Sequence, residues 1–417
     1  MLSKRILILG GGRYNVPSIH AAREAGFLTL VADRNPAAPG LKAADHALPI
    51  DLSDCESLTH AVAQYGGVDG VVSMAEVGVR AAANISARLG LPSISEEAAA
   101  NATSKAAMRR HWQGIGRYSA SFEVVDGLDE ARLAVNRLGR FPLIFKPDRS
   151  FGGSRGVTRV ERFEEVANAF HAAQAGGLAH SEVVIEQCVE GSEHSAEVLI
   201  WEGKTSVLCI GQKIKSRLPY RVDVSVQYPA QLTAVQEATV ADMCNRAVFA
   251  LGLTQGVAHV EFGYTNHGPV LFELGARCGG GHTPQIAHHV SGVNEFVEAC
   301  RMACGTPPSQ FEPSRRRGAD YRFLVFAPGV VEQVAITGTL GSDGDILDVG
   351  VTVQPGDEIR PLHSTSERVG FLVAVGETLP EAVERADRGC RKILIRYADG
   401  TIRHAAELVE FRELAHS

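Results

Sequence analysis

Short apolar runs alternate with stretches of helical apolar spacing through the first hundred residues of the chain. Apolar runs of strand length lie at residues 5–9, 27–32 and 68–73. Stretches with the apolar spacing of a helix lie at residues 17–25 and 80–89, and Gly90 is placed to end the second one. Strands that alternate with helices in this way predict a parallel, doubly wound sheet, so we expect an N-terminal α/β domain over residues 1–100.

From about residue 101 onward the pattern becomes rich in strands. A helix is expected at residues 101–112, and apolar runs bounded by Gly and Pro predict strands at 141–146, 156–160, 183–187, 194–201, 205–214, 257–263 and 269–274. Such runs favour antiparallel sheets, and we expect an α+β catalytic domain over residues 101–312. A C-terminal α+β domain is expected over residues 313–417, with strands at 321–326, 331–336, 370–375 and 392–396 and a helix at 379–393.

Composition and charge exclude several classes of protein. The chain has 417 residues, of which 45% are hydrophobic and 21% are charged, as in an ordinary globular protein. Its formal charge of −7 argues against a nucleic-acid partner, and we interpret the short basic run at 315–317 as a solvated linker. No apolar run approaches the ~18 residues that span a bilayer, and the N-terminus lacks a signal-peptide core. The eight cysteines show no CxxC spacing, so we expect reduced thiols, a cytoplasmic location and no membrane partner.

A glycine turn follows the first predicted strand. Gly10, Gly11 and Gly12 are followed by Asp33 at the end of the second strand, roughly where the acid of an NAD-binding motif would stand. The third glycine position of that motif is occupied by Asn15. We therefore favour a tight strand-to-helix turn that binds no dinucleotide, and an NAD-dependent enzyme stays as an alternative.

A lysine beside a flexible glycine loop is suited to binding a triphosphate. Lys146 closes an apolar strand, and a loop with Gly152, Gly153 and Ser154 follows within a few residues. The ammonium supplies charge, and glycines let backbone N–H groups approach phosphate oxygens. The loop at 150–156 is expected to act as a lid that nucleotide orders. Read alone, the same pattern would be a hairpin turn with a surface lysine.

The next motif could line a slot for a purine base. An apolar strand ends at Glu186, and a short connector of Gln187, Cys188 and Val189 leads on to Glu193. The connector's backbone could read the edge of adenine, and the Glu193 carboxylate could accept hydrogen bonds from ribose hydroxyls. The alternative is a pair of exposed glutamates that flank a turn.

Two carboxylates occupy neighbouring strands of a predicted hairpin. Glu261 and Glu273 each stand among apolar residues on either side of a turn at 266–268. Buried carboxylates at this separation repel each other unless a cation lies between them. Hard oxygen ligands of this kind suit Mg²⁺ that is shared with substrate phosphates. Arg277, four residues after Glu273, could stabilise developing negative charge at the same place.

The order of these motifs resembles that of the ATP-grasp superfamily, and the resemblance covers nearly the whole chain. It implies the ATP-grasp fold, with ATP and Mg²⁺ (or Mn²⁺) as cofactors. By resemblance, Lys105 and Lys146 would contact the ATP phosphates, the segment 186–189 would hold adenine, and Glu193 would hold ribose. Glu261 and Glu273 would bind the metal.

One departure narrows the resemblance. Gly275 stands where many members have an asparagine metal ligand, which puts the D-alanine–D-alanine ligase and carbamoyl-phosphate synthase assignments in doubt. The Glu273-to-Arg277 spacing, the His259-Val260-Glu261 sequence and the segment 368–371 look more like the bacilysin-synthetase type of L-amino acid ligase. The resemblance therefore implies a carboxylate–amine ligase that works through an acyl phosphate.

The remaining expectations concern roles and partners. Lys146 and Arg277 are the expected catalytic residues, and the candidate substrate-binding residues are Glu76, His259, Gly280 and His282. The expected partners are a small carboxylate and a small amine, and the chain is expected to form a homodimer. Two other functions stay open, a carboxylase of the biotin-carboxylase kind and a non-catalytic ATP-binding protein.

Overall fold

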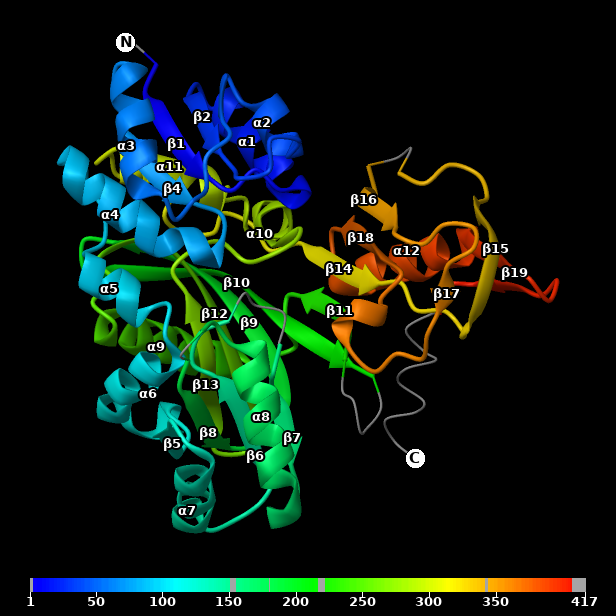
Figure 1. The fold of residues 1–417 in the computed structure, drawn as a ribbon. Coiled ribbons are helices and arrows are strands. Elements are labelled where there is room, and N and C mark those ends of the chain that lie inside the picture. The colour runs from blue at the N-terminus through cyan, green and yellow to red at the C-terminus, as the bar shows by residue number, and fades with distance from the viewer. Residues whose placement is uncertain (1–2, 151–154, 180, 217–221, 342–343, 407–417) are drawn as a thin grey trace.

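The computed structural model describes residues 3–150, 155–179, 181–216, 222–341 and 344–406. In this part of the chain the strands form four sheets, three of four strands and one of eight (Figure 1). Their arrangement gives an N-terminal α/β unit, a lid unit, a central sheet and a C-terminal α+β unit. The predicted combination of α/β and α+β architecture is thereby confirmed.

The N-terminal sheet is parallel, with the strand order β3–β2–β1–β4. Its strands are β1 (Arg5–Leu9), β2 (Leu28–Ala32), β3 (His46–Leu48) and β4 (Gly70–Ser73). Its helices are α1 (Val16–Glu24), α2 (Pro39–Ala43), α3 (Cys55–Gln64) and α4 (Val79–Leu89), and α5 (Glu96–Asn101) leads out of the unit. As predicted, α4 ends at Gly90, whose φ of 66° is the left-handed conformation that glycine adopts easily.

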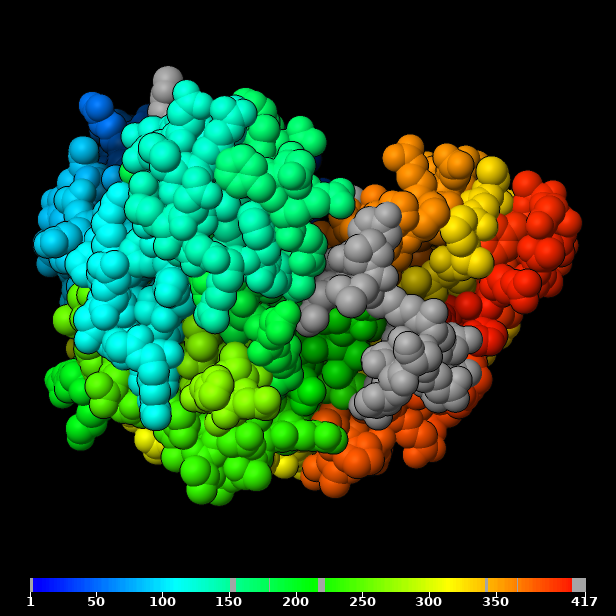
Figure 2. Space-filling view, turned by 90° about the horizontal axis from the view of Figure 1, so that it is seen from below, coloured from blue at the N-terminus to red at the C-terminus, as the bar shows by residue number. Residues whose placement is uncertain are grey.

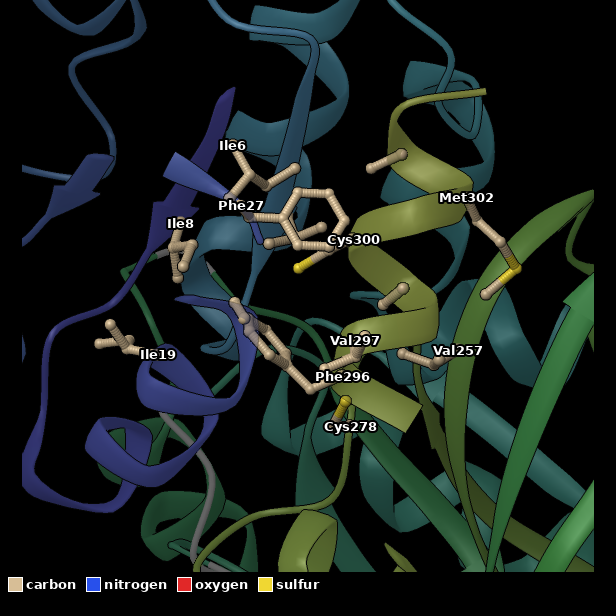
Figure 3. Packing of buried hydrophobic residues seen from close by; sticks show 14 of the residues in the cluster. Ile6, Ile8, Ile19, Phe27, Val257, Cys278, Phe296, Val297, Cys300 and Met302 are labelled. Atoms are coloured by element: carbon tan, nitrogen blue, oxygen red, sulfur yellow. The ribbon is translucent and has the colours of Figure 1, made fainter. Parts of the chain in front are cut away.

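One face of the N-terminal sheet is covered by a helix from much later in the chain. Helix α11 (Glu295–Ala303) packs its apolar side against β1 and α1 (Figure 3). Ile6 and Phe27 lie over Cys300, while Val257 and Met302 lie on the side of the helix that faces the central sheet. This shared core attaches the N-terminal unit to the central sheet.

The lid unit, named after the predicted lid loop at residues 150–156, is an antiparallel sheet with its own core. Its strand order is β5 (Phe122–Val125), β8 (Val183–Gln187), β6 (Leu143–Pro147) and β7 (Thr158–Val160). Helices α7 (Leu128–Leu138) and α8 (Val166–Gly176) pack on this sheet, and a separate cluster of buried residues lies between them and the strands. Helix α6 (Lys105–Trp112) joins the lid to the N-terminal unit.

The central sheet has eight strands, all antiparallel to their neighbours, in the order β13–β12–β9–β10–β11–β14–β18–β16. The first five strands in this order are β13 (Gly268–Gly275), β12 (Gln255–Thr265), β9 (Ser192–Trp201), β10 (Lys204–Lys215) and β11 (Asp223–Tyr228). The last three are β14 (Gly318–Phe323), β18 (Gly370–Gly376) and β16 (Ile346–Val351). Helices α9 (Ala234–Ala250) and α10 (Thr283–Ser291) complete this part of the fold. This single sheet contains strands from both sides of residue 312, where a domain boundary is expected from sequence.

A buried polar network joins β11 to β14 on the face of the sheet away from the cavity described below. The Asp320 carboxylate accepts from the Ser225 hydroxyl at 2.7 Å and pairs with Arg322 at 2.7 Å. Arg322 also reaches Asp387 of α12 (Leu379–Lys392) at 2.7 Å. These side chains tie the C-terminal unit to the central sheet by charge-assisted hydrogen bonds as well as by strand pairing.

The C-terminal unit adds a small antiparallel sheet. Its strand order is β17 (Glu358–Ile359), β15 (Gly329–Ile336), β19 (Ile393–Tyr397) and β20 (Ile402–His404). Seen from below, the lid unit and the C-terminal unit stand on opposite sides of a hollow (Figure 2). No helix within the described ranges has both the length and the apolar character needed to cross a bilayer.

Candidate active site

A cavity of about 910 Å³ lies where the lid, the central sheet and the C-terminal unit meet. Its wall brings together nearly all of the residues that the sequence singles out, namely Glu76, Lys105, Lys146, Glu186, Gln187, Cys188, Val189, Glu193, His259, Glu261, Glu273, Arg277 and Gly280. Gly152, Gly153 and Ser154, and with them most of the expected lid loop, lie outside the described residues. The cavity is large enough for a nucleotide together with small substrates.

A buried ion cluster holds Lys146 at the end of β6. Its Nζ lies 2.8 Å from Glu186 Oε2. Glu186 Oε1 also accepts a hydrogen bond from Arg109 Nε at 2.6 Å. Although burial raises the pKa of Glu186, Arg109 and Lys146 hold it below its usual value. Burial lowers the pKa of Lys146, and Glu186 offsets part of that shift. The Glu186 side chain thus positions two cations, a role that the sequence did not indicate.

Arg109 is a site residue that the sequence analysis missed. Its guanidinium also donates to the carbonyls of Leu271 and Phe272 at 2.8 and 3.0 Å, so it ties the lid to β13. Arg109 stands four residues after Lys105 on α6, and that spacing puts both side chains on one helix face. This spacing is the signal that could have found it.

Hydrogen bonds to Asp148, at the end of β6, fix Lys105 at the start of α6. Ser104 caps the helix, and its hydroxyl donates to Asp148 Oδ1 at 2.7 Å, which also accepts from the Ala106 amide. The Lys105 ammonium then lies 2.7 Å from Glu273 Oε1. Burial lowers the pKa of Lys105, but Glu273, together with Glu76 and Asp148, outweighs this effect, so the pKa is raised. Lys105 is therefore held in its charged form at the cavity wall.

The two hairpin carboxylates face each other as predicted. Glu261 pairs with Glu273 in the register of β12 and β13. Glu261 Oε2 lies 2.9 Å from Lys213 Nζ. Although burial raises the pKa of Glu261, Lys213 and His259 together keep it well below its usual value. Lys213, on β10, is a second site residue that the sequence analysis missed.

The donor set at the hairpin suits a magnesium ion shared with a nucleotide. Mg²⁺ is usually bound through one or two carboxylates and substrate phosphates, with water in the remaining positions. Glu261 and Glu273 supply two such carboxylates at one point of the cavity wall. No group of three or more His, Cys, Asp or Glu residues in the described segments could hold a metal by itself. The residues present therefore fit a metal that arrives with phosphate ligands.

His259 is held beside the hairpin by a buried carboxylate. Its Nδ1 lies 2.6 Å from Glu197 Oε1, and its Nε2 lies 3.3 Å from Glu261 Oε1. Burial lowers the pKa of His259, but the carboxylates of Glu197 and Glu261 together outweigh it, and the pKa rises to about 10. Glu197 is fully buried and also accepts from the Gly279 amide at 3.1 Å. The buried Glu197 carboxylate thus orients the imidazole so that its Nε2 edge faces Glu261.

Arg277 and Glu76 form an ion pair between the central sheet and the N-terminal unit. Arg277 Nε lies 2.9 Å from Glu76 Oε2. A Cβ at Gly275 would lie 3.1 Å from that same Glu76 oxygen and 3.3 Å from the Arg277 guanidinium carbon. The glycine that departs from the family pattern therefore makes room for this pair, and an asparagine here would displace it.

The connector after β8 forms one side of the cavity. The backbone N–H groups of Gln187 and Cys188 donate to the carbonyls of Ser121 and Pro142 at 3.0 and 3.1 Å. These bonds hold the connector in an extended form along the cavity wall. Beyond it, Glu193 pairs with Lys215 at 2.6 Å. The residue after Cys188, Val189, also lines the cavity.

His282 lies in a packed aromatic cluster and not on the cavity wall. Its ring contacts those of Tyr14, Tyr321 and Phe371 at centroid distances of 5.4, 5.6 and 4.7 Å. Only 4% of the residue is exposed, and burial lowers the pKa of its imidazole. A role of His282 in substrate binding stays a prediction, and these contacts indicate that it would act through its neighbours.

Protein groups occupy the space beside the glycine turn after β1. The Gly11 amide donates to Asp33 Oδ2 at 2.9 Å, so the acid that could have met a ribose caps the turn instead. A Cβ at Gly40, in α2, would lie 2.6 Å from Gly11 Cα. This close packing gives a structural reason for the glycine-rich turn without any dinucleotide.

Three family models match consecutive parts of the chain. One described as ATP-grasp N-terminal domain matches residues 19–93, and one described as ATP-grasp domain matches residues 139–285. One described as L-amino acid ligase C-terminal domain 2 matches residues 322–398. They confirm the resemblance inferred from the order of motifs.

Several individual proteins are similar to the chain in sequence or in structure. A formate-dependent phosphoribosylglycinamide formyltransferase of Haloquadratum walsbyi is 26% identical over 391 residues, which cover 91% of this chain and 92% of that protein. Carnosine synthase 1 of Mus musculus is 29% identical over 136 residues, which cover 33% of this chain and 16% of that protein. The crystal structure of an L-amino acid ligase from Bacillus licheniformis matches with a TM-score of 0.80 and 24% identity, covering 95% of this chain and 99% of the other. The last match establishes a shared fold.

Proposed function

Because this chain is an ATP-grasp protein, we propose that it is an ATP-dependent carboxylate–amine ligase that joins small substrates through an acyl phosphate. The observation that carries the proposal is the pairing of Glu261 with Glu273 in a cavity that also holds Lys105, Lys146 and Arg277. Paired carboxylates with this many cations suit the transfer of a phosphoryl group from ATP.

The chemistry follows from the positions of the charged groups. The substrate carboxylate attacks the γ-phosphorus, and ADP leaves. Lys105 and Lys146 neutralise charge on the phosphate oxygens during this step. A divalent ion held by Glu261 and Glu273 would supply further positive charge and align the phosphates. The amine then attacks the acyl carbon, loses a proton and expels phosphate, while Arg277 stabilises the negative oxygen that forms on that carbon.

The names of similar proteins support the choice of substrates. An L-amino acid ligase shares the fold, and the C-terminal segment matches a family model of that ligase type. A synthase named for carnosine is also similar over part of the chain. We therefore propose that amino acids are among the substrates, as the sequence resemblance implies.

A screen of substrate pairs tests the proposal. ADP release would be measured with MgATP and pairs of amino acids, and condensed products would be identified by mass spectrometry. A ligase should release one ADP and one phosphate for each amide formed. ADP release that depends on bicarbonate and gives no condensed product with a broad set of amines would instead identify a carboxylase.

Lys146 should be needed for ATP binding. Replacing it with methionine keeps the length of the side chain and leaves Arg109 to pair with Glu186. The loss of a charge-assisted contact costs roughly 1.5–3 kcal/mol, so we expect the KM for ATP to rise roughly 10- to 150-fold. Lys204→Met, at an exposed lysine of β10, is the matched control. Equal ATP kinetics in the two folded variants would show that Lys146 does not touch the nucleotide.

Arg277 should act in the capture of the acyl phosphate. Arg277→Lys keeps the charge but loses the planar pair of donors, so we expect amide formation to fall about 10- to 100-fold. ADP release should fall less, and the yield of amide per ADP should therefore drop. The control is Arg246→Lys, at a half-exposed arginine on α9. A lysine variant with an unchanged yield of amide per ADP would remove Arg277 from this step.

We propose a cytoplasmic homodimer whose substrates are small molecules. Light scattering on the purified chain would test the dimer, and a monomeric mass at working concentration would contradict it.

A further inference from the structure

Arg368 reaches into the cavity from the C-terminal unit, just before β18. Its guanidinium stacks on Phe323, with 3.7 Å between the guanidinium carbon and the ring centroid. Its Nε donates to the backbone carbonyl of Asp223 at 3.0 Å. Only 16% of the side chain is exposed, and the residue lines the same cavity as Arg277. The reaction proposed above gives this arginine no task.

Part of the hydrogen-bonding capacity of Arg368 is unused within the described residues. Its buried Nη2 has no hydrogen-bond partner there. Nη2 forms a long ion pair with Asp223 Oδ2 at 3.6 Å, whereas the other oxygen of Asp223 pairs closely with Lys215 at 2.7 Å. Burial lowers the pKa of Arg368, although an arginine keeps its charge in proteins. A buried guanidinium with donors left over is costly unless a ligand supplies an anion.

Aromatic and apolar side chains form much of the cavity wall near Arg368, and the paired Lys215 and Asp223 line the same cavity. Val226 of β11 lies opposite Tyr321 of β14 in the strand register, and both line the cavity together with Tyr228 and Phe323. A bound anion would therefore meet the planar donors of Arg368 beside a largely apolar wall, since the nearby Lys215 already pairs with Glu193 and Asp223. This favours a small, singly charged carboxylate over a phosphate, because a doubly charged group needs more cations and would lie close to Asp223.

We propose that Arg368 binds the free carboxylate of the amine substrate, which makes the acceptor an α-amino acid or a peptide. This inference rests on the proposed ligase function. The carboxylate that is activated must reach the γ-phosphate beside Glu261, Glu273 and Arg277, so it is not available to a second site. An anion site elsewhere in the same cavity therefore serves the other substrate. The apolar wall of Val226 and Tyr321 would hold the part of the acceptor next to its carboxylate.

The test compares each acceptor amino acid with its carboxamide, which has the same amine but no carboxylate charge. In the unaltered enzyme, kcat/KM should be roughly 10- to 100-fold higher for the amino acid than for the carboxamide. Arg368→Met should raise the KM of the amino acid by a similar factor and bring the two acceptors to near equality. The KM values for ATP and for the carboxylate substrate should stay unchanged. Arg388→Met, at a half-exposed arginine of α12, is the matched control.

The outcomes separate the inference from the proposed function. Arg368→Lys provides a second variant, and binding of an ATP analogue shows that either variant is folded. If the unaltered enzyme makes amide and Arg368→Met keeps its preference for the charged acceptor, the inference alone is overturned. The same holds if only the KM of the carboxylate substrate rises, or if phosphorylated amines replace amino acids as acceptors. If no amine yields an amide at all, the ligase function fails, and the inference fails with it.

Discussion

A Glu273→Gln variant should fold normally and lose about 10³-fold or more of its turnover. Glu273 pairs with Lys105 at 2.7 Å and stands opposite Glu261 on the hairpin. Glutamine keeps the shape of the side chain but removes a negative charge that the metal needs. Metal ions contribute several kcal/mol to transition states of this kind, and about 4 kcal/mol corresponds to the expected factor.

The measurement is ADP release at millimolar Mg²⁺ under saturating substrates. Glu332→Gln, at an exposed glutamate of β15, removes the same charge outside the cavity and should leave turnover unchanged. Thermal unfolding of both variants would show that the fold is intact. Near-normal ADP release by the folded Glu273→Gln variant would contradict the assignment of this carboxylate to the metal.

The largest effect on stability is expected from Arg109→Ala. The arginine is 1% exposed and meets Glu186 at 2.6 and 3.0 Å. Its loss leaves Glu186 with Lys146 alone and removes the donors from two buried carbonyls of β13. Removing one partner of a buried ion pair costs about 3–5 kcal/mol, so the free energy of unfolding should fall by that amount.

Denaturant unfolding near neutral pH measures this change. Arg110→Ala is a close control, because Arg110 is exposed and pairs with Glu182 at 3.2 Å on the surface. Its loss should cost less than about 1 kcal/mol. Equal destabilisation by the two substitutions would show that the buried cluster adds nothing specific.

The same cluster predicts a pH dependence. Although burial raises the pKa of Glu186, Arg109 and Lys146 hold it below the ordinary 4.5, so the unfolded chain binds the proton more readily. The stabilisation is therefore fully present above about pH 4.5 and is lost as the pH falls below it. In Arg109→Ala, stability should fall less steeply over this acidic range.

The sequence predicted the elements whose apolar pattern is local. Strand β1 and helix α4 are found where the periodicity placed them, and the hairpin of β12 and β13 sets its two glutamates opposite each other. Each of these depends on neighbouring residues and on a turn. The pattern within a segment is then enough to place it.

Features that depend on distant residues were missed or misplaced. The helix expected at 101–112 is interrupted, and α6 begins only at Lys105, because Ser104 caps it with the help of Asp148 from the end of β6. Strand alternation puts Lys213 and Lys215 on one face of β10, but it does not say that Lys213 meets Glu261. Such partners are set by the order of strands in the sheet, which a single sequence leaves open.

Chimeras between this chain and its relatives would have to keep the pairing between β11 and β14 intact. A fragment starting at residue 313 would carry β14 with a bare hydrogen-bonding edge, which invites pairing with other chains. It would also separate Asp320 from Ser225, and Arg368 from the Asp223 carbonyl. Acceptor choice is therefore expected to transfer between such enzymes only when β11 and the C-terminal unit are exchanged together.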